Sequence, residues 1–414
     1  MLFRILYFLL AASSAAAQFT SLSLEEAIRQ AWDRDPTVAT LALAPEIARA
    51  RAEQAGIRPN PEIEFSGSTP APFQNEGEWG VGVGISQRLP RRERIERARA
   101  LARLGGDVVT WQLRERRRQL AGEVRALFYE TAVQRQRLGV AQETLAAHRR
   151  LAGVLERRQA AGEVGAAQLD VLAVESQRAV QALALAEVEL ATLRERLRLR
   201  LRLPADVAVE TDLSLATVLD RPVPEMPIDW DEVRPELALA RHAVREAEAS
   251  LALGRAESRS DWSVGAGFEF ERRANDFTGR LESEPRLSVG ASVPWPRTVP
   301  NRGEIRERET LVQIAEAQLV AVHDALRAEV AAAVATVHLL QPVIRVQRQV
   351  VEGAEPVPPT LVTAYERGEL SGLELAQARQ QRFATQLDFL HAAQRYAAAL
   401  AAAETAVGLV PSQP

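Results

Sequence analysis

Apolar and polar side chains alternate with a period of two in four short stretches of the chain: 61–67, 79–89, 261–271 and 285–295. In the last three, aromatic and branched residues share one face, while Gly, Ser and charged residues occupy the other. This is the period of a β-strand, whose successive side chains point to opposite faces. The pattern predicts two β-hairpins, 61–89 and 261–295.

The apolar face of these strands has the character of a surface that meets lipid. A continuous apolar face with aromatic residues at its ends is typical of outer-membrane strands, and a tilted spanning strand takes about 9–11 residues. We predict that these side chains face lipid: Trp79, Val81, Val83, Ile85, Trp262, Val264, Phe268, Val289 and Trp295. A soluble, half-buried sheet alternates in the same way, so alternation alone leaves both structures open.

Between and after the strands, apolar residues recur at alternating spacings of three and four. Leu183, Ala186 and Leu190 are an example. This spacing keeps one seam against a neighbouring helix and is typical of coiled coils. It predicts helices that run about 100 Å over 92–158 alone, at about 1.5 Å per residue. A compact helical bundle, the alternative, would need much shorter helices.

The second half of the chain repeats the first at an offset of 206 residues, so that Gly162 recurs as Gly368 and Val83 as Val289. Each repeat contains a helix, a β-hairpin and long helices, the latter covering 92–203 and 303–408. The chain is accordingly divided into a leader 1–17, a first repeat 18–203, a proline-rich linker 204–230, a second repeat 231–408 and a tail 409–414.

The first 17 residues predict a secretory signal peptide. Arg4 precedes the apolar run 5–12, and the small residues 15–17 form a cleavage site before Gln18. The apolar run is well short of the roughly 20 residues of a spanning helix. Because no later stretch of that length looks free of charges, we expect no transmembrane helix and a membrane crossing by strands alone.

Composition excludes several classes of function. The chain has no cysteine, so we expect no lipid anchor and no thiolate site. Its 51 basic residues, all Arg, are interspersed with 55 acidic residues, which leaves no basic face for nucleic acid. No phosphate-binding loop or catalytic set is recognisable. The histidines lack the spacing of metal ligands: His148, His242, His323, His338 and His391. We expect no cofactor, no metal site and no enzymatic activity.

Four strands are too few to close a β-barrel, because about eight is the smallest number with a filled interior. An open sheet edge in hydrocarbon leaves backbone groups unpaired at several kcal/mol each. If the strands lie in a bilayer, several chains must therefore share one barrel. Two chains would supply about eight strands and three about twelve, and the strand count does not choose between them.

The second half contains Ala364-Tyr365-Glu366-Arg367-Gly368-Glu369-Leu370-Ser371, followed by a Leu/Ala-rich helix that ends at Ala406-Val407-Gly408. With this segment as the strongest part, the chain resembles the TolC-type outer-membrane efflux proteins. The run Asn301-Arg302-Gly303-Glu304-Ile305, after Pro294-Trp295-Pro296, is similar to the hairpin-to-helix entry of the heavy-metal, CzcC-like branch. The resemblance extends over about 21–408.

This resemblance implies a mainly α-helical fold with a small β part. It implies a homotrimer with a twelve-strand β-barrel in the outer membrane of a Gram-negative bacterium and an α-helical tunnel in the periplasm. The implied function is a passive conduit of a tripartite efflux system, with heavy-metal cations as a candidate cargo. A periplasmic adaptor (membrane fusion protein) and an inner-membrane pump of the resistance-nodulation-division (RND) type are the implied partners. A periplasmic coiled-coil scaffold and an adaptor protein, both without a pore, are the alternatives.

The resemblance also implies sites at the tips of the helical hairpins. The adaptor would dock on Gly162, Val164, Gly165, Gly368, Leu370 and Ser371. Glu374 and Gln377 match positions where well-known members narrow the pore with acidic residues, and only Glu374 keeps the charge. Three Glu374 carboxylates around one axis would attract cations. A solvated surface glutamate without function is the alternative.

Overall fold

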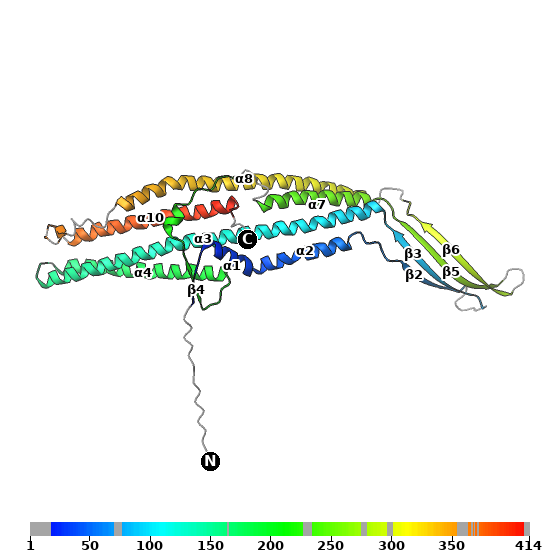
Figure 1. Cartoon of the computed structure of the whole chain (residues 1–414), viewed down its shortest axis with the longest axis horizontal. Helices are drawn as coiled ribbons and strands as arrows, with labels where there is room; N and C mark the ends of the chain where they lie inside the picture. The colour runs from blue at the N-terminus through cyan, green and yellow to red at the C-terminus, as the bar shows by residue number, and fades with distance from the viewer. Residues whose placement is uncertain are drawn as a thin grey trace, which may run out of the picture. The chain divides into compact units, whose positions relative to one another are not determined.

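The computed structural model describes residues 18–69, 77–163, 165–226, 234–274, 280–295, 301–353, 363–365, 367, 369–370 and 372–409. The predicted leader, 1–17, lies outside the described residues, as do the predicted tip residues Val164, Gly368 and Ser371. The fold is mainly helical with a small β part, which confirms that coarse prediction (Figure 1).

The chain divides into two compact units. The first contains the described residues within 1–39, 114–234 and 324–414, and the second those within 40–113 and 235–323. Two long helices, α3 (Arg92–Ala160) and α8 (Arg302–Gly353), have residues in both units. Each half of the sequence therefore contributes to each unit.

The second unit contains a four-stranded sheet with the order β2-β3-β5-β6, antiparallel throughout. Its strands are β2 (Glu62–Ser68), β3 (Trp79–Leu89), β5 (Trp262–Ala274) and β6 (Leu281–Ser292). β3 pairs with β5, so the two hairpins lie side by side in one sheet. The alternating pattern predicts each hairpin but not this pairing between them.

β6 differs most from the predicted strand 285–295. It begins at Leu281, includes Pro285 and ends at Ser292, so Trp295 lies beyond its end. Pro285 has no N–H to donate to the ladder, and proline within a sheet is found mainly on strands at the edge, as β6 is in the sheet formed by this chain. Pro294, just past the end, cannot continue the ladder as a donor.

Around the sheet, the second unit contains most of α2 (Pro36–Gln54), all of α7 (Pro235–Glu257) and the first parts of α3 and α8. Asp261, directly before β5, accepts a hydrogen bond from Nη1 of Arg94 at 2.6 Å and one from the backbone N–H of Arg91 at 3.3 Å. These bonds attach the start of β5 to the start of α3. The sheet and the helices of this unit are thereby held together by polar contacts at the strand ends.

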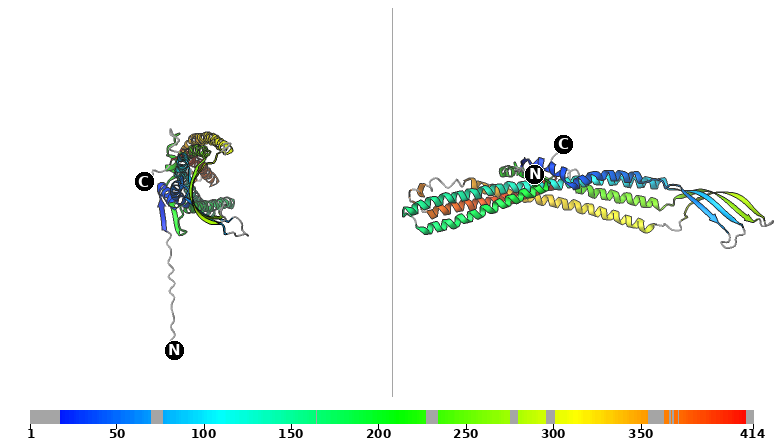
Figure 2. Two further views of the ribbon diagram at one scale, coloured as in Figure 1. Left: turned by 90° about the vertical axis from the view of Figure 1, so that its right-hand side faces the viewer. Right: turned by 90° about the horizontal axis from the view of Figure 1, so that it is seen from below.

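The first unit contains α1 (Leu24–Arg34), α4 (Ala166–Arg200), α5 (Leu215–Leu219) and α10 (Gly372–Ala406), with the later parts of α3 and α8. β1 (Gln18–Leu22) pairs in parallel with β4 (Val207–Thr211). α4 runs back along α3 in both Figure 1 and Figure 2. The core of the first unit is made of fully buried side chains from α3, α4 and α10: Leu120, Phe128, Leu197, Tyr396 and Leu400.

A buried carboxylate near the end of α10 joins three elements of the first unit. Glu404 accepts a hydrogen bond from the Tyr129 hydroxyl at 2.7 Å and one from Nε of Arg221 at 2.9 Å. Nε of Arg125 lies 2.9 Å from the same carboxylate. Burial and the nearby charge of Glu404 raise the pKa of Tyr129 well above its usual value. The linker residue Arg221 is thus tied to both α3 and α10.

Among the described helices, α8 is long and apolar enough to cross a membrane on length and composition. Its longest charge-free run is 330–344, short of the roughly 20 residues of a spanning helix, so the absence of a transmembrane helix stays a prediction. The apolar window is rich in Ala, Val and Leu but also includes charged residues. Only 17% of that window is buried within the single chain, which leaves its apolar side chains uncovered by the rest of the chain.

Candidate functional site

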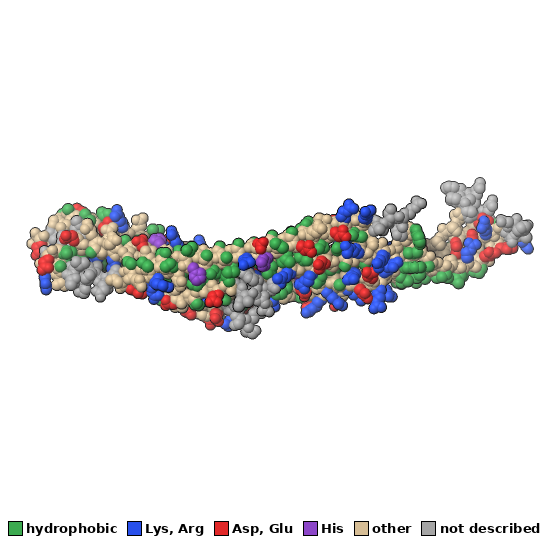
Figure 3. All heavy atoms as spheres, turned by 90° about the horizontal axis from the view of Figure 1, so that it is seen from above, with side chains coloured by type: hydrophobic (Ala, Val, Ile, Leu, Met, Phe, Trp, Pro, Cys, Tyr) green, Lys and Arg blue, Asp and Glu red, His purple; other side chains and the backbone are tan. Residues whose placement is uncertain are grey.

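The sheet of the second unit gathers the predicted lipid-facing residues on one face. Across the strands Val83 is opposite Phe268, and Phe268 is opposite Leu287, which gives one apolar row. Ile85, Ala266 and Val289 form the next row. Val289 is 81% exposed, although burial would be expected for such a residue in a soluble sheet. Figure 3 shows hydrophobic side chains gathered along the visible part of this sheet.

The opposite face of the sheet is polar. Glycines at the centre alternate in register with Ser and charged residues, as where Gly82 pairs with Glu269 and Glu269 pairs with Arg286. This face carries six glutamates and three arginines: Glu62, Glu64, Glu269, Glu271, Glu282, Glu284, Arg88, Arg273 and Arg286. A sheet with one exposed apolar face and one charged face separates an apolar from an aqueous environment.

Aromatic side chains lie at both ends of the apolar face. At one end the rings of Trp79 and Phe270 are 6.0 Å apart, and at the other Trp262 is opposite Leu89. Trp295, three residues past β6, is 89% exposed. Tryptophan at the two ends of an apolar band is typical of residues at the interface of lipid and water.

The turn between α3 and α4 is closed by a glycine with a left-handed backbone. Gly162 has φ +77°, and its N–H donates to the carbonyl of Gln159 at 2.9 Å. The N–H of Glu163 donates to the carbonyl of Arg158 at 2.9 Å, which completes a Schellman motif. Gly165, by contrast, has φ −77° at the N-cap of α4. Of these two predicted tip glycines, only Gly162 has a conformation that specifically favours glycine.

The second tip closes with the same hydrogen bond at the equivalent position. The N–H of Glu369 donates to the carbonyl of Ala364 at 2.9 Å, the counterpart of the bond from Glu163 to Arg158. Leu370 packs on a buried apolar cluster that joins both tips: Leu151, Leu155, Leu172, Tyr365 and Leu375. The two hairpin ends are therefore held together by a common core, in addition to being similar in sequence.

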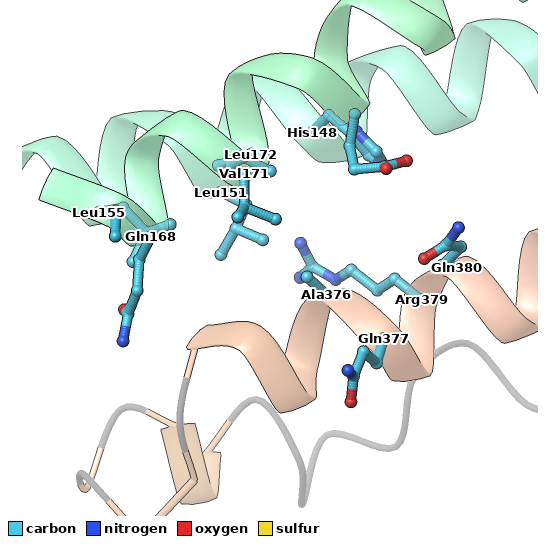
Figure 4. Close-up of a pocket in the computed structure, with 12 residues that line it drawn as sticks. His148, Leu151, Leu155, Gln168, Val171, Leu172, Ala376, Gln377, Arg379 and Gln380 are labelled. Atoms are coloured by element: carbon cyan, nitrogen blue, oxygen red, sulfur yellow. The ribbon is translucent and has the colours of Figure 1, made fainter. Parts of the chain in front are cut away.

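A cavity of about 380 Å³ lies beside this cluster, between α10 and the pair α3–α4. Figure 4 shows the side chain of Arg379 extending from α10 into this space, with His148 on the side of α3. Leu151, Leu155 and Leu172 supply much of its apolar wall. Burial lowers the pKa of His148, and the positive charge of Arg379 lowers it further, against an opposing effect of Glu175.

The match to a family of known proteins decides the identity of the chain. The sequence model of the outer membrane efflux proteins matches residues 27–203 and 231–409, one segment in each half of the chain. The chain belongs to the outer membrane efflux protein family. The predicted relationship to TolC-type outer-membrane proteins is thereby confirmed. No curated protein matches the sequence significantly.

Solved structures of outer-membrane channels share the fold. CusC has a TM-score of 0.73 at 18% identity, covering 94% of this chain and 93% of that one. The CmeC outer membrane channel of Campylobacter jejuni has a TM-score of 0.72 at 12% identity, covering 93% and 85%. The outer membrane protein VceC of Vibrio cholerae has a TM-score of 0.69 at 15% identity, covering 93% and 96%. At identities this low, the similarity to these channels shows only that the fold is shared.

As an outer membrane efflux protein, the chain is an outer-membrane channel of tripartite efflux systems and a transport conduit, not an enzyme. Proteins of this family work as trimers with periplasmic adaptors and inner-membrane pumps. The assignment to the heavy-metal, CzcC-like branch stays a prediction.

The candidate constriction residues of this efflux protein both lie in the first turns of α10. Glu374 and Gln377 are exposed, one helical turn apart, and Gln377 also contributes to the lining of the tip cavity. Gln377 shares this cavity with Ala167 and Gln168 at the start of α4.

Arg379 and His148 were missed at the tip by sequence reasoning. Arg379 is one of many arginines on an Ala/Gln/Arg-rich helix, and nothing in its spacing distinguishes it. His148 on α3 is separated from α10 by α4, the linker, α7, the strands β5 and β6 and α8, so no local pattern brings the two together. Only their convergence on one cavity marks them.

Proposed function

We propose that three copies of the chain close one twelve-strand β-barrel in the outer membrane and continue as an α-helical tunnel in the periplasm. The observation that supports this most strongly is the four-stranded sheet with a continuous exposed apolar face. Within the chain, β2 and β6 each pair on one side only. Pairing β6 of one copy with β2 of the next removes both edges, as a bilayer requires.

The exposed apolar side chains of α8 support the same assembly. In the first unit Leu339, Val343 and Val346 are exposed, with Leu339 at 74%. A helix in the periplasm cannot leave such a row in water without cost, at about 25 cal/mol per Å² of apolar surface. Neighbouring copies that pack side by side would cover this row and so stabilise the trimer.

The tips of the helical hairpins are the proposed docking surface for the periplasmic adaptor. Of the six candidate residues, Gly162, Gly165 and Leu370 lie in the described part of the chain, at the ends of α3, α4 and the segment before α10. A membrane fusion protein would bind there and connect the channel to an inner-membrane pump of the RND type. The leader 1–17 would direct export to the periplasm and would then be cleaved off. The mature chain would carry no lipid anchor.

We propose heavy-metal cations as cargo, on the resemblance of the segment after 301 to the CzcC-like branch. Glu374 is consistent with this cargo, because it is exposed at the start of α10. Three such carboxylates around the axis would form a ring that attracts cations. Glu374→Gln should lower the cation selectivity of the reconstituted channel. An unchanged selectivity would show that Glu374 does not line the pore.

The barrel is tested by placing one charge on each face of the same strand. Val289→Arg puts a cation on the apolar face of β6, and Ser292→Arg puts the same cation on the polar face. An arginine that faces lipid near mid-depth costs about 2–4 kcal/mol. We expect Val289→Arg to reduce the yield of SDS-resistant trimers in outer-membrane fractions, and Ser292→Arg to leave it near normal. Equal yields from both variants would contradict a lipid-facing apolar surface.

A further inference from the structure

The tip cavity has a size suited to a small molecule. Its volume of about 380 Å³ lies within the range of ligand pockets in proteins, about 300–1,000 Å³. Its walls come from three helices, with leucines from α3 and α4 on one side and Ala376 of α10 on the other. All the lining residues belong to the first unit.

One positive charge in this cavity lacks an ionic partner. Arg379 is within ion-pair distance of no carboxylate of the described residues, and its one hydrogen bond is long, 3.5 Å from Nη1 to the carbonyl of Ala147. Glu175, which also lines the cavity, pairs instead with Arg178 at 2.7 Å. Burial lowers the pKa of Arg379, and the like charge of Arg150 lowers it further. A half-buried cation in this position favours an anion.

A second polar group near Arg379 also has no partner. Nδ1 of His148 is buried and has no hydrogen-bond partner among the described residues. In Figure 4 the side chains of His148 and Gln380 lie at the same end of the cavity as the stem of Arg379. The guanidinium end of Arg379 points toward the side of Leu151 and Leu172, away from Gln380 (Figure 4). The lining therefore offers a cation beside an apolar wall, with polar side chains further along, and Glu175 adds one carboxylate near His148.

We propose that this cavity binds a small organic carboxylate, whose anionic head pairs with Arg379 and whose apolar body lies against Leu151, Leu155 and Leu172. The ligand would bridge α10 to the α3–α4 pair at the tip of the channel. A bare metal cation does not fit, because Arg379 would repel it. An inorganic anion would leave the apolar wall without a partner. The site belongs to the first unit, whereas the sheet belongs to the second. It borders the proposed docking surface through Leu370 and includes Gln377 of the candidate constriction.

The proposal is tested on the full-length trimer in amphipol, with 4-phenylbutyrate as the probe and 4-phenylbutyramide as its neutral counterpart. Titration calorimetry should give a dissociation constant of about 0.1–1 mM for the carboxylate. The amide should bind about tenfold more weakly or worse, because a hydrogen bond to a charged group is lost. Arg379→Gln should weaken binding of the carboxylate by a similar factor. Arg395→Gln, at an exposed position further along α10, is the matched control and should leave binding of the carboxylate unchanged.

Introduced thiols provide a second measurement, because the chain has no cysteine of its own. In an Ala376→Cys variant, 4-phenylbutyrate should slow alkylation by N-ethylmaleimide at least about threefold at saturation, and Arg379→Gln should abolish this protection. Equal binding of acid and amide, or protection that survives Arg379→Gln, would overturn the proposal. Protection by an adaptor but not by the carboxylate would also overturn it, in favour of a protein occupant. Failure of trimer or barrel formation would be seen separately, in the mass of the particle.

Discussion

The guanidinium of Arg158 lies over the ring of Tyr365, with 4.4 Å between Cζ and the ring centroid. Nη2 of Arg158 also donates a hydrogen bond to the carbonyl of Tyr365 at 3.1 Å. Arg158 is in the last turn of α3, and Tyr365 ends the short helical segment 363–365 before α10. One side chain thus connects the tips of the two hairpins, and it does so through both a ring and a backbone group.

We expect the ring of Tyr365, but not its hydroxyl, to contribute to the stability of the tip. Tyr365 is 3% exposed, and its hydroxyl has no hydrogen-bond partner among the described residues. Tyr365→Leu removes the cation–π contact and part of the packing, and should destabilise the tip by about 1–3 kcal/mol. Tyr365→Phe keeps both and removes a buried polar group without a partner, so stability should be unchanged or higher. Hydrogen exchange of the last turns of α3 would measure both, and equal effects of Leu and Phe would contradict the role of the ring.

The two glycines of the first tip should respond differently to the same substitution. Gly162 has φ +77°, and no atom of the residues described around it lies within 4 Å of an added Cβ, so Gly162→Ser should cost about 1 kcal/mol through backbone strain. Gly165 has φ −77° and ψ 154° at the N-cap of α4, where serine is a preferred residue. Gly165→Ser should therefore be neutral or slightly stabilising. Unfolding midpoints of the two variants would compare them, and a larger loss at Gly165 would contradict this account.

The strands of the sheet could be predicted largely from the sequence. β3 covers the stretch 79–89 that alternation predicts, because Trp79, Val81 and Val83 put all the large apolar groups on one face. β6 was placed too late in the chain because alternation continues past Pro294 while the hydrogen-bonded ladder does not. The period of a strand specifies its faces but not its neighbour, so the pairing of β3 with β5 was not predictable in this way.

The functional surfaces were predictable where they depend on local pattern. Gly162 at the tip follows from the repeat and from the conformational needs of a tight turn. Arg379 and Glu404 depend on distant segments, and charged residues on coiled-coil helices usually remain solvated. Nothing in the spacing around Glu404 distinguishes it from an exposed glutamate. Its burial arises only when α10 packs against α3 and the linker.

Glu404 is expected to be the carboxylate whose loss costs most in the first unit. Its side chain is 4% exposed and faces Arg125, which is 5% exposed. Glu404→Gln removes the charge but not the bulk, and leaves a buried arginine uncompensated, at about 3–5 kcal/mol. Glu352→Gln, in an exposed pair with Arg348, is the matched control and should change stability by less than about 1 kcal/mol. Denaturant unfolding of the trimer measures both. Similar losses would mean that Glu404 is solvated.

The last prediction concerns pH. The pKa of His148 in the folded protein lies below its usual value of 6.5, because the ring is partly buried and faces Arg379. Between the folded pKa and about 6.5 the unfolded chain binds more protons than the folded one, so the tip should lose stability as the pH falls through this window. Above about pH 6.5 this contribution should be constant. His148→Leu should flatten the pH dependence, whereas Arg379→Gln should narrow the window by removing one cause of the shift. Hydrogen exchange of the tip amides between about pH 5 and pH 8 would measure this. A slope in His148→Leu equal to that of the unmodified protein would assign the effect to another group.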